Sequence, residues 1–173
     1  MATEMQIRQG NQIGGCVTII TYTGDGVTTR IMIDYGMSLP GAEKKEEYKH
    51  DWEREPVDAV LFTHYHGDHA GRFLEIPTKT RLYLGGASRQ VMINIYQALT
   101  RARDQRTASS AREALAVLRD DARIVEVKRD TPMNIGPVTV TGYEVDHSAC
   151  DAYMYLIETP DKTILHTGDF RGH

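Results

Sequence analysis

The chain has 173 residues and a net charge of −4, and 40% of its residues are hydrophobic and 25% are charged. This length favours one domain spanning residues 1–173, the composition is that of a soluble globular protein, and no stretch reaches the roughly 20 apolar residues of a membrane span. The acidic balance argues against a generic nucleic-acid coat, and the lack of a visible secretory signal and of a disulfide framework favours a cytoplasmic protein.

Segments with alternating or β-branched residues predict strands in the first third of the chain: residues 5–9, 16–22, 29–34 and 59–62. The Asp25-Gly26 step is typical of a tight hairpin turn between the second and third of these strands. Residues 38–52 contain Pro40 and a run of charges, which predict a surface loop with a helical turn.

A cluster of metal-binding residue types follows the apolar segment 59–62: Thr63-His64-Tyr65-His66-Gly67-Asp68-His69. Neutral imidazoles and ionised carboxylates are the ligands that a borderline divalent cation such as zinc prefers. His64 and His66 project to the same side of an extended segment, whereas a helical zinc motif spaces its histidines four residues apart. Gly67 allows a sharp turn, after which Asp68 and His69 can face a second cation. The motif therefore predicts a metal site at a strand end.

The rest of the chain predicts both helices and strands. A short helix is expected over residues 68–74, a longer one over 87–103, and another near residue 107, capped by Thr107 or Ser109. Residues 101–129 carry eight bases and five acids, which indicates a solvated helix face or a local cationic track. Five more segments, separated by breaks such as Pro132, predict strands: residues 81–84, 123–127, 138–145, 152–158 and 163–166.

Two polar residues stand where the late strands end. His147 follows the strand 138–145, and Asp169 follows the strand 163–166. Two imidazoles leave a zinc ion in need of further ligands, which makes His147 a candidate. A carboxylate can bridge two cations, as two-metal hydrolases require, which makes Asp169 a candidate for the bridge. Cys150 lies close to His147, but its spacing matches no metal-binding pattern.

The order of these residues resembles the motifs of the metallo-β-lactamase superfamily: Asp34, His64-x-His66-x-Asp68-His69, His147 and Asp169. Three segments look like the β-CASP branch of nucleases, which includes RNase J: Asn11-Gln12-Ile13-Gly14-Gly15-Cys16, Val145-Asp146-His147-Ser148 and Thr167-Gly168-Asp169-Phe170-Arg171. The resemblance implies an α/β (α+β) fold, a metallo-β-lactamase-type αββα sandwich. This chain would be its amino-terminal part, without the cap and the distal half.

The resemblance also implies a dinuclear zinc site at one sheet edge, with Mn²⁺ as an alternative ion. The ligands of the first zinc would be His64, His66 and His147, those of the second Asp68 and His69, and the bridge Asp169. A last histidine of the second site lies beyond His173 in the family, so the second site would be incomplete within these residues.

Other residues are expected to act without binding a metal tightly. Asp68 is the candidate catalytic residue, because it could orient or deprotonate the attacking water if it is not held by the metal. Asp34, His166 and Ser148 are expected around the ligands. For His166, a purely structural position beneath the site is an equal alternative.

The function implied is metal-dependent hydrolysis of a phosphodiester in nucleic acid, with RNA favoured over DNA. Two zinc ions would lower the pKa of bound water toward ~7 and clamp the attacking and leaving oxygens. Two alternatives stay open: a small-molecule hydrolase of the same superfamily, acting on a thioester, lactone or phosphodiester, and a non-catalytic binding module. The isolated chain is expected to be weakly active or inactive, because distant substrate contacts would be missing.

Half of a sandwich would leave the late strands, residues 138–145 and 152–158, without a covering sheet on their inner face. Such an apolar face favours self-association, most simply as a homodimer. The alternative is that the strands of residues 5–34 already form the opposing sheet and leave a monomer.

Overall fold

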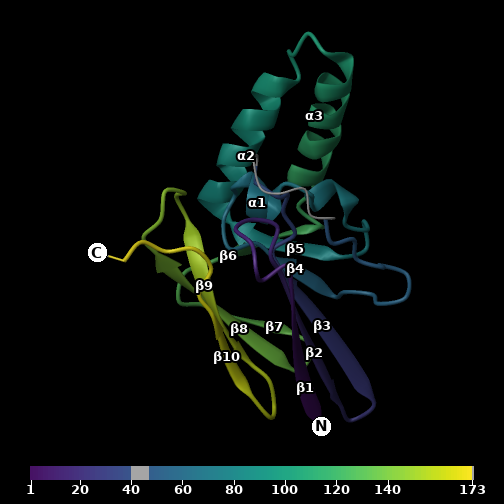
Figure 1. The fold of residues 1–173 in the computed structure, drawn as a ribbon, viewed down its shortest axis with the longest axis vertical. Coiled ribbons are helices and arrows are strands. Elements are labelled where there is room, and N and C mark those ends of the chain that lie inside the picture. The colour runs from purple at the N-terminus through teal and green to yellow at the C-terminus, as the bar shows by residue number, and fades with distance from the viewer. Residues whose placement is uncertain (40–46, 173) are drawn as a thin grey trace.

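The computed structural model describes residues 1–39 and 47–172, which form two β-sheets and a set of helices (Figure 1). One sheet has six strands in the order β1 (Ala2–Arg8), β2 (Val17–Gly24), β3 (Val27–Ile33), β4 (Ala59–Leu61), β5 (Arg81–Gly85) and β6 (Ile124–Val127). The other has four strands, in the order β10 (Thr163–His166), β9 (Ala152–Glu158), β8 (Val138–Val145) and β7 (Pro132–Ile135). The helices are α1 (Gly67–Ala70), the 3₁₀ turn η1 (Phe73–Glu75), α2 (Gly86–Leu99) and α3 (Gln105–Leu118).

The six-stranded sheet begins as an antiparallel hairpin and continues as a parallel sheet. Asp25 and Gly26, which connect β2 to β3, have positive φ angles of 51° and 76°, as a tight turn between twisted strands requires. Strands β3, β4, β5 and β6 then pair in parallel. The carboxyl ends of β3 and β4 therefore meet at the same edge of the sheet, and this edge carries the histidine motif.

The helices α2 and α3 form a hairpin that packs on the outer face of this sheet and projects beyond it (Figure 1). Met92 of α2 and Leu118 of α3 join a buried cluster with apolar residues of the strands. The cap of α3 differs from the expectation, because Asp104 accepts a hydrogen bond from the backbone N–H of Thr107 at 2.8 Å. Thr107 is thus the third residue of the helix, and an acid three residues earlier was the cap signal.

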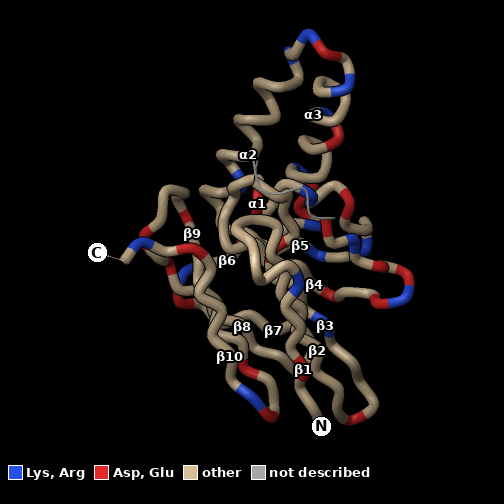
Figure 2. Tube along the Cα trace, in the orientation of Figure 1, with Lys and Arg blue, Asp and Glu red and all other residues tan. Residues whose placement is uncertain are grey.

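The tip of this hairpin carries part of the basic segment noted in the sequence. Arg101, Arg103 and Arg106 follow the end of α2 and are exposed, and Figure 2 shows basic residues at the tip of the hairpin. They stand apart from both sheets, so at the tip the excess of bases lies on a solvated helix hairpin.

The inner face of the four-stranded sheet is covered by the six-stranded sheet. Tyr155 and Ile157 of β9, each 0% exposed, pack in one cluster with Ile31, Ile33 and Leu61 of the first sheet. The expectation of an open apolar face is therefore wrong, and the alternative in which the early strands form the opposing sheet is correct. The prediction of a homodimer was based on an exposed inner face, and this face is already covered within one chain.

The far end of the sandwich is closed by polar contacts between the first strand and the turn between β9 and β10. The backbone N–H of Thr3 donates to the carboxylate of Asp161 at 3.1 Å, and the Thr3 hydroxyl also donates to this carboxylate. Lys162 Nζ donates to the Thr3 carbonyl at 2.9 Å. These contacts join residues of the two sheets that are more than 150 positions apart in the sequence.

Strand β7 was not expected, because Pro132 was interpreted as a break; proline is compatible with the first residue of an edge strand, and β7 is such a strand. Of the predicted loop 38–52, residues 40–46 lie outside the described residues. Within the described ranges, no helix is both long enough and apolar enough to span a membrane.

Candidate metal centre

The histidine motif lies where β3 and β4 end side by side. Asp34 directly follows β3, and its backbone N–H donates to the carbonyl of Leu61, the last residue of β4, at 2.9 Å. The chain then continues through Thr63 and His64, which are both 1% exposed. The short helix α1 begins at Gly67 and turns His69 back toward the same edge, as the sequence predicts.

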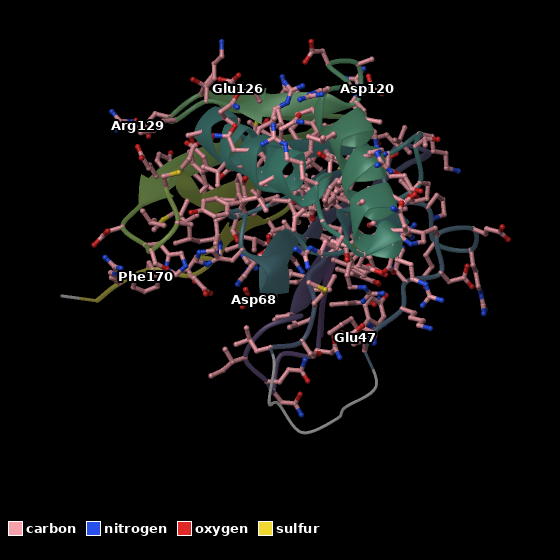
Figure 3. All side chains as sticks on the ribbon, turned by 90° about the horizontal axis from the view of Figure 1, so that it is seen from above. Glu47, Asp68, Asp120, Glu126, Arg129 and Phe170 are labelled. Atoms are coloured by element: carbon pink, nitrogen blue, oxygen red, sulfur yellow. The ribbon has the colours of Figure 1, made fainter. Side chains whose placement is uncertain are left out.

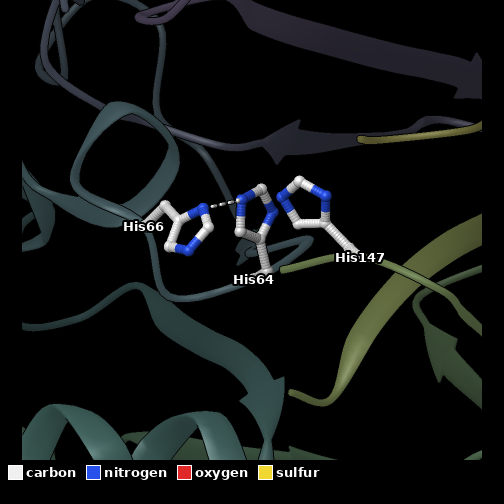
Figure 4. Close-up of side chains that lie close together, drawn as sticks. All are labelled: His64, His66 and His147. Carbon is white, nitrogen blue, oxygen red and sulfur yellow. Dashed lines mark hydrogen bonds between the residues drawn. The ribbon is translucent and has the colours of Figure 1, made fainter. Parts of the chain in front are cut away.

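Three imidazoles meet at this edge: His64 and His66 from the motif, and His147 from the segment between β8 and β9 (Figure 4). One nitrogen from each ring lies within 4.8 Å of the others. His64 Nε2 lies 3.0 Å from His66 Nδ1, and the ring centres of His64 and His147 are 4.6 Å apart. This spacing suits nitrogens that converge on one cation, because zinc binds each imidazole nitrogen at about 2.0–2.1 Å.

His147 Nε2 supplies the strongest indication that a cation belongs here. It is a buried polar atom with no hydrogen-bond partner among the described residues. Burying such an atom without a partner is costly, so it requires an explanation. A metal ion bound between His147 and the other two imidazoles satisfies it, and a set of three neutral imidazoles fits the preference of zinc.

A second group of ligand types lies beside the first and shares His64 with it. His64, His69 and Asp169 offer three atoms that are within 4.8 Å of one another. His69 Nε2 lies 3.4 Å from Asp169 Oδ2 and 3.6 Å from Asp68 Oδ2. Asp68 and Phe170, the neighbour of Asp169, lie on the same side of the molecule (Figure 3). The two acids and His69 can thus face a second cation next to the first.

Asp34 and Thr63 hold these histidines from behind. The Asp34 carboxylate is 3% exposed and accepts three hydrogen bonds of 2.8 Å, from the N–H and hydroxyl of Thr63 and from His69 Nδ1. Because the Thr63 hydroxyl donates to Asp34, it can accept from His64 Nδ1, which is 3.0 Å away. Both histidines then turn Nε2 toward the candidate metal centre. Thr63 was named as the first residue of the motif, two residues after β4 ends, but no role was assigned to it from the sequence.

The surroundings set the protonation of the histidines. Burial and the neighbouring His69 lower the pKa of His64 to about 3, so this imidazole is neutral and ready to bind a metal. Burial and the nearby His147 also lower the pKa of His66. Burial acts against the proton on His69 too, but the hydrogen bond and charge of Asp34 outweigh it and raise the pKa of His69 to about 9. A metal at this second position must therefore displace a proton.

The remaining predicted residues lie at different distances from the centre. His166 is partly buried and lines a depression of about 420 Å³ together with Asp34, His69 and Asp169. This depression opens the second group to solvent, and apolar residues of β1 and β10 form its walls. Ser148 is exposed and makes no hydrogen bond with any residue that the structure describes. Cys150 is also exposed and belongs to neither ligand group.

Two facing sheets with a histidine-rich centre at one edge define a class of metal-binding hydrolases. Residues 15–172 match the model of the metallo-β-lactamase superfamily, and the chain belongs to this superfamily. Solved structures agree on the fold. A protein of unknown function from Enterococcus faecalis V583 superposes with a TM-score of 0.68 at 19% identity, covering 98% of this chain and 43% of that protein. A subclass B3 metallo-β-lactamase from a soil metagenome, MEM-A1, gives 0.57 at 14% identity, covering 98% of this chain and 64% of that one.

The curated relatives include endoribonucleases. The chain is 27% identical over 171 residues to endoribonuclease ysh1 of Emericella nidulans and 24% identical over 173 residues to ribonuclease J of Sinorhizobium meliloti. These matches cover 93% and 92% of this chain but only 19% and 27% of the relatives. This distant homology confirms the resemblance to the β-CASP nuclease branch, and the chain corresponds to a minor part of such a protein.

Proposed function

We propose that the site hydrolyses phosphodiesters with the help of two bound metal ions, most simply zinc. The observation that carries the proposal is the pair of adjacent ligand groups that share His64, one made of imidazoles and one containing the carboxylate of Asp169. A phosphodiester is anionic, so its hydrolysis needs positive charge near the phosphorus oxygens and an activated water. Two neighbouring cations supply both when they are bound.

Different residues of the chain would bind the two cations and hold the ligands in place. His64, His66 and His147 would hold the first cation, and His69 and Asp169 would hold the second with Asp68 beside them. Asp169 would also be the candidate to bridge the two positions, because a carboxylate has two oxygens and this one lies within 4.8 Å of nitrogens of both His64 and His69. Asp34 keeps His69 in the orientation that turns Nε2 toward the centre.

Asp68 is the candidate catalytic residue. Its Oδ2 lies 3.6 Å from His69 Nε2, so a water in the centre can come within hydrogen-bond distance of this carboxylate. Asp68 would orient that water or take its proton. The Asp34 carboxylate already accepts three hydrogen bonds and has no such freedom, and the Asp169 carboxylate is assigned to the cations.

The relatives named ribonuclease and endoribonuclease support nucleic acid, and RNA before DNA, as the substrate of the protein in which these residues act. The local site itself would also accept other esters, since the ligand groups recognise charge rather than a base or sugar. An experiment must therefore distinguish hydrolysis of phosphodiesters from hydrolysis of thioesters or lactones at this site.

Bis(4-nitrophenyl) phosphate tests the proposal directly, because this activated phosphodiester reacts without help from distant binding surfaces. We expect zinc- or manganese-dependent hydrolysis by the chain, abolished by a chelator and by Asp169→Asn. The matched control is Asp121→Asn, which alters an acid whose side chain is 86% exposed and pairs only with Arg89 among the described residues. That variant should keep the full rate.

The same preparation is given a thioester and a lactone with matched leaving groups. Faster metal-dependent turnover of either, with no phosphodiester hydrolysis, would replace the proposal by a small-molecule hydrolase. Short single-stranded RNA and DNA of equal length are then added as competitors of bis(4-nitrophenyl) phosphate, to test whether the site prefers RNA to DNA. RNA should inhibit hydrolysis of the activated ester at lower concentration than DNA.

A further inference from the structure

The segment that carries His147 is anchored at its other end by an aspartate outside the metal centre. Strand β8 ends at Val145 and β9 begins at Ala152, and residues 146–151 connect them. His147 lies near the start of this connection and Asp151 is its last residue. Asp151 belongs to neither group of metal-ligand types.

Both oxygens of the Asp151 carboxylate are used. Oδ2 accepts hydrogen bonds from the backbone N–H groups of Ala87 and Ser88, at 2.8 and 3.3 Å, in the first turn of α2. Oδ1 accepts a hydrogen bond of 2.7 Å from the hydroxyl of Tyr153. The carboxylate therefore caps the N-terminal end of the 14-residue helix α2, and at the same time it is held by the Tyr153 hydroxyl of β9.

The contact is reciprocal and close. The hydroxyl of Ser88, which is 1% exposed, lies 3.2 Å from the carbonyl of Cys150 and 3.3 Å from that of Asp151, and donates to them. A Cβ on Gly85 would lie 2.1 Å from Asp151 Oδ2, so only glycine allows this approach. Asp151 itself has a φ of +60°, a left-handed conformation that aspartate tolerates better than most residues.

These contacts connect the His147 segment to the strands that deliver the other two imidazoles. Gly85 ends β5, and β5 pairs in parallel with β4, which leads into His64. On the other side, the backbone N–H of Tyr153 donates to the carbonyl of Thr63, the residue before His64, at 2.9 Å. The connection is thus fastened to the first sheet directly after it has passed the metal centre.

We propose that Asp151 is a positioning residue for His147: by fastening the connection to the first turn of α2, it holds the His147 imidazole within reach of His64 and His66. The proposal rests on the metal centre described above. His147 Nε2 is buried without a hydrogen-bond partner among the described residues. If the segment were free to move, this nitrogen could turn to water and form hydrogen bonds there, and metal binding would have to break them. Holding the segment in place therefore favours metal binding.

The test compares zinc affinity in Asp151→Ala and Asp130→Ala. Asp130 is a suitable control because it also has a positive φ, of 55°, and lines one surface depression together with Asp151, but its carboxylate pairs with Arg129, at 3.4 Å, and not with α2. Both substitutions thus impose a similar backbone strain. Asp151→Gly removes the strain altogether, and Asp151→Asn keeps a carbonyl oxygen that can accept from Ala87.

Zinc affinity is measured by competition with a chromophoric chelator, and the geometry of the site by the absorption of the cobalt-substituted protein. We expect Asp151→Ala and Asp151→Gly to lose about 10–100-fold in affinity for the tighter ion and to alter its cobalt spectrum. Asp130→Ala should match the wild type, and Asp151→Asn should recover most of the loss. In a His147→Ala background, Asp151→Ala should cause no further loss.

Three outcomes overturn the proposal. Affinity in Asp151→Gly equal to that of the wild type would show that the carboxylate does not position His147. An equal loss with and without His147 would show that Asp151 acts only through general stability. Failure of the wild type to bind zinc at all would remove the metal centre and the proposed function together, whereas the first two outcomes leave that function intact.

Discussion

His69 donates a hydrogen bond from Nδ1 to Asp34 at 2.8 Å, and this pair is buried directly behind the candidate metal centre. The carboxylate fixes which nitrogen of the ring carries the proton in the metal-bound state, and it leaves Nε2 to face Asp68 and Asp169. Without a metal, the same carboxylate favours a second proton on the ring. The pair therefore couples metal binding, pH and stability at one place.

The metal-free protein should be most stable near pH 6.5. The pKa of His69 is raised from 6.5 to about 9, so its contribution to folding is complete below pH 6.5 and is lost as the pH rises toward 9. The pKa of His64 is lowered from 6.5 to about 3, so stability also falls as the pH drops from 6.5 toward 3. Urea unfolding in the presence of a chelator, repeated between pH 3 and pH 9, measures the decline of the free energy of unfolding on both sides of pH 6.5.

The variant Asp34→Asn separates the decline of stability above pH 6.5 from the decline below it. It removes the anion that contributes most to raising the pKa of His69, so the decline of stability between pH 6.5 and 9 should become smaller, with Asp169 and Asp68 sustaining the remainder, while the acidic decline remains. A metal-free wild type whose free energy of unfolding does not change between pH 6.5 and 9 would contradict the assignment.

Thr63→Val should destabilise the protein by about 1–3 kcal/mol and weaken zinc binding. The substitution keeps the shape of the side chain but removes the hydroxyl that donates to Asp34 and can accept from His64 Nδ1. Thr63→Ser keeps the hydroxyl and serves as the control. Urea unfolding with a chelator gives the first effect, and zinc competition gives the second. Equal behaviour of the two variants would mean that the hydroxyl does not orient His64.

Zinc stoichiometry should distinguish the two ligand groups. We expect the purified chain to bind between about one and two equivalents, with the tighter ion at the three imidazoles. Because His64 directs Nδ1 to Thr63 and Nε2 to the three-imidazole group, His64→Ala and His66→Ala should both weaken the tighter ion and leave the second ion largely in place. Elemental analysis with titration measures this, and an unchanged zinc content in the His64→Ala/His66→Ala double variant would refute the site.

RNA cleavage by this chain alone should be slow. The chain corresponds to 19% and 27% of the length of the two named endoribonuclease relatives, and distant contacts normally position the scissile phosphate. We expect cleavage of single-stranded RNA well below ~1 per second, even when the chain hydrolyses the activated ester. Metal-dependent RNA cleavage at or above this rate would show that residues 1–173 suffice.

The sequence predicts best the elements whose side chains follow a simple period. The bounds of β8, β9 and β10 agree with the prediction, because each is a run of β-branched, aromatic and apolar residues that ends at turn residues. Strand β7 was missed because a break at Pro132 and an edge strand beginning at Pro132 look the same in a sequence. The open inner face was a wrong expectation because the packing of the first sheet on the second is a long-range property that no local pattern encodes.

The candidate site divides in the same way. The ligand types at His64, His66 and His147 were predicted from residue chemistry at strand ends, and the structure brings them together. The residues that support them were less visible. Thr63 and Asp151 act through hydrogen bonds to segments 29 to 64 positions away, and neither has a residue type that signals such a role.

The contact between Thr3 and Asp161 also constrains how the protein forms during synthesis. The two residues are 158 positions apart, and a ribosome that adds 5–20 residues per second needs on the order of ten to thirty seconds to make the intervening chain. During this time β1 can pair with β2, but its end has no partner from the other sheet. Met5 and Ile7 are exposed on β1, the edge strand of its sheet, and until Asp161 is made this edge lacks its contact with the second sheet and can pair with other chains. Nascent chains stalled before residue 161 should therefore be the species most prone to aggregate and to bind chaperones.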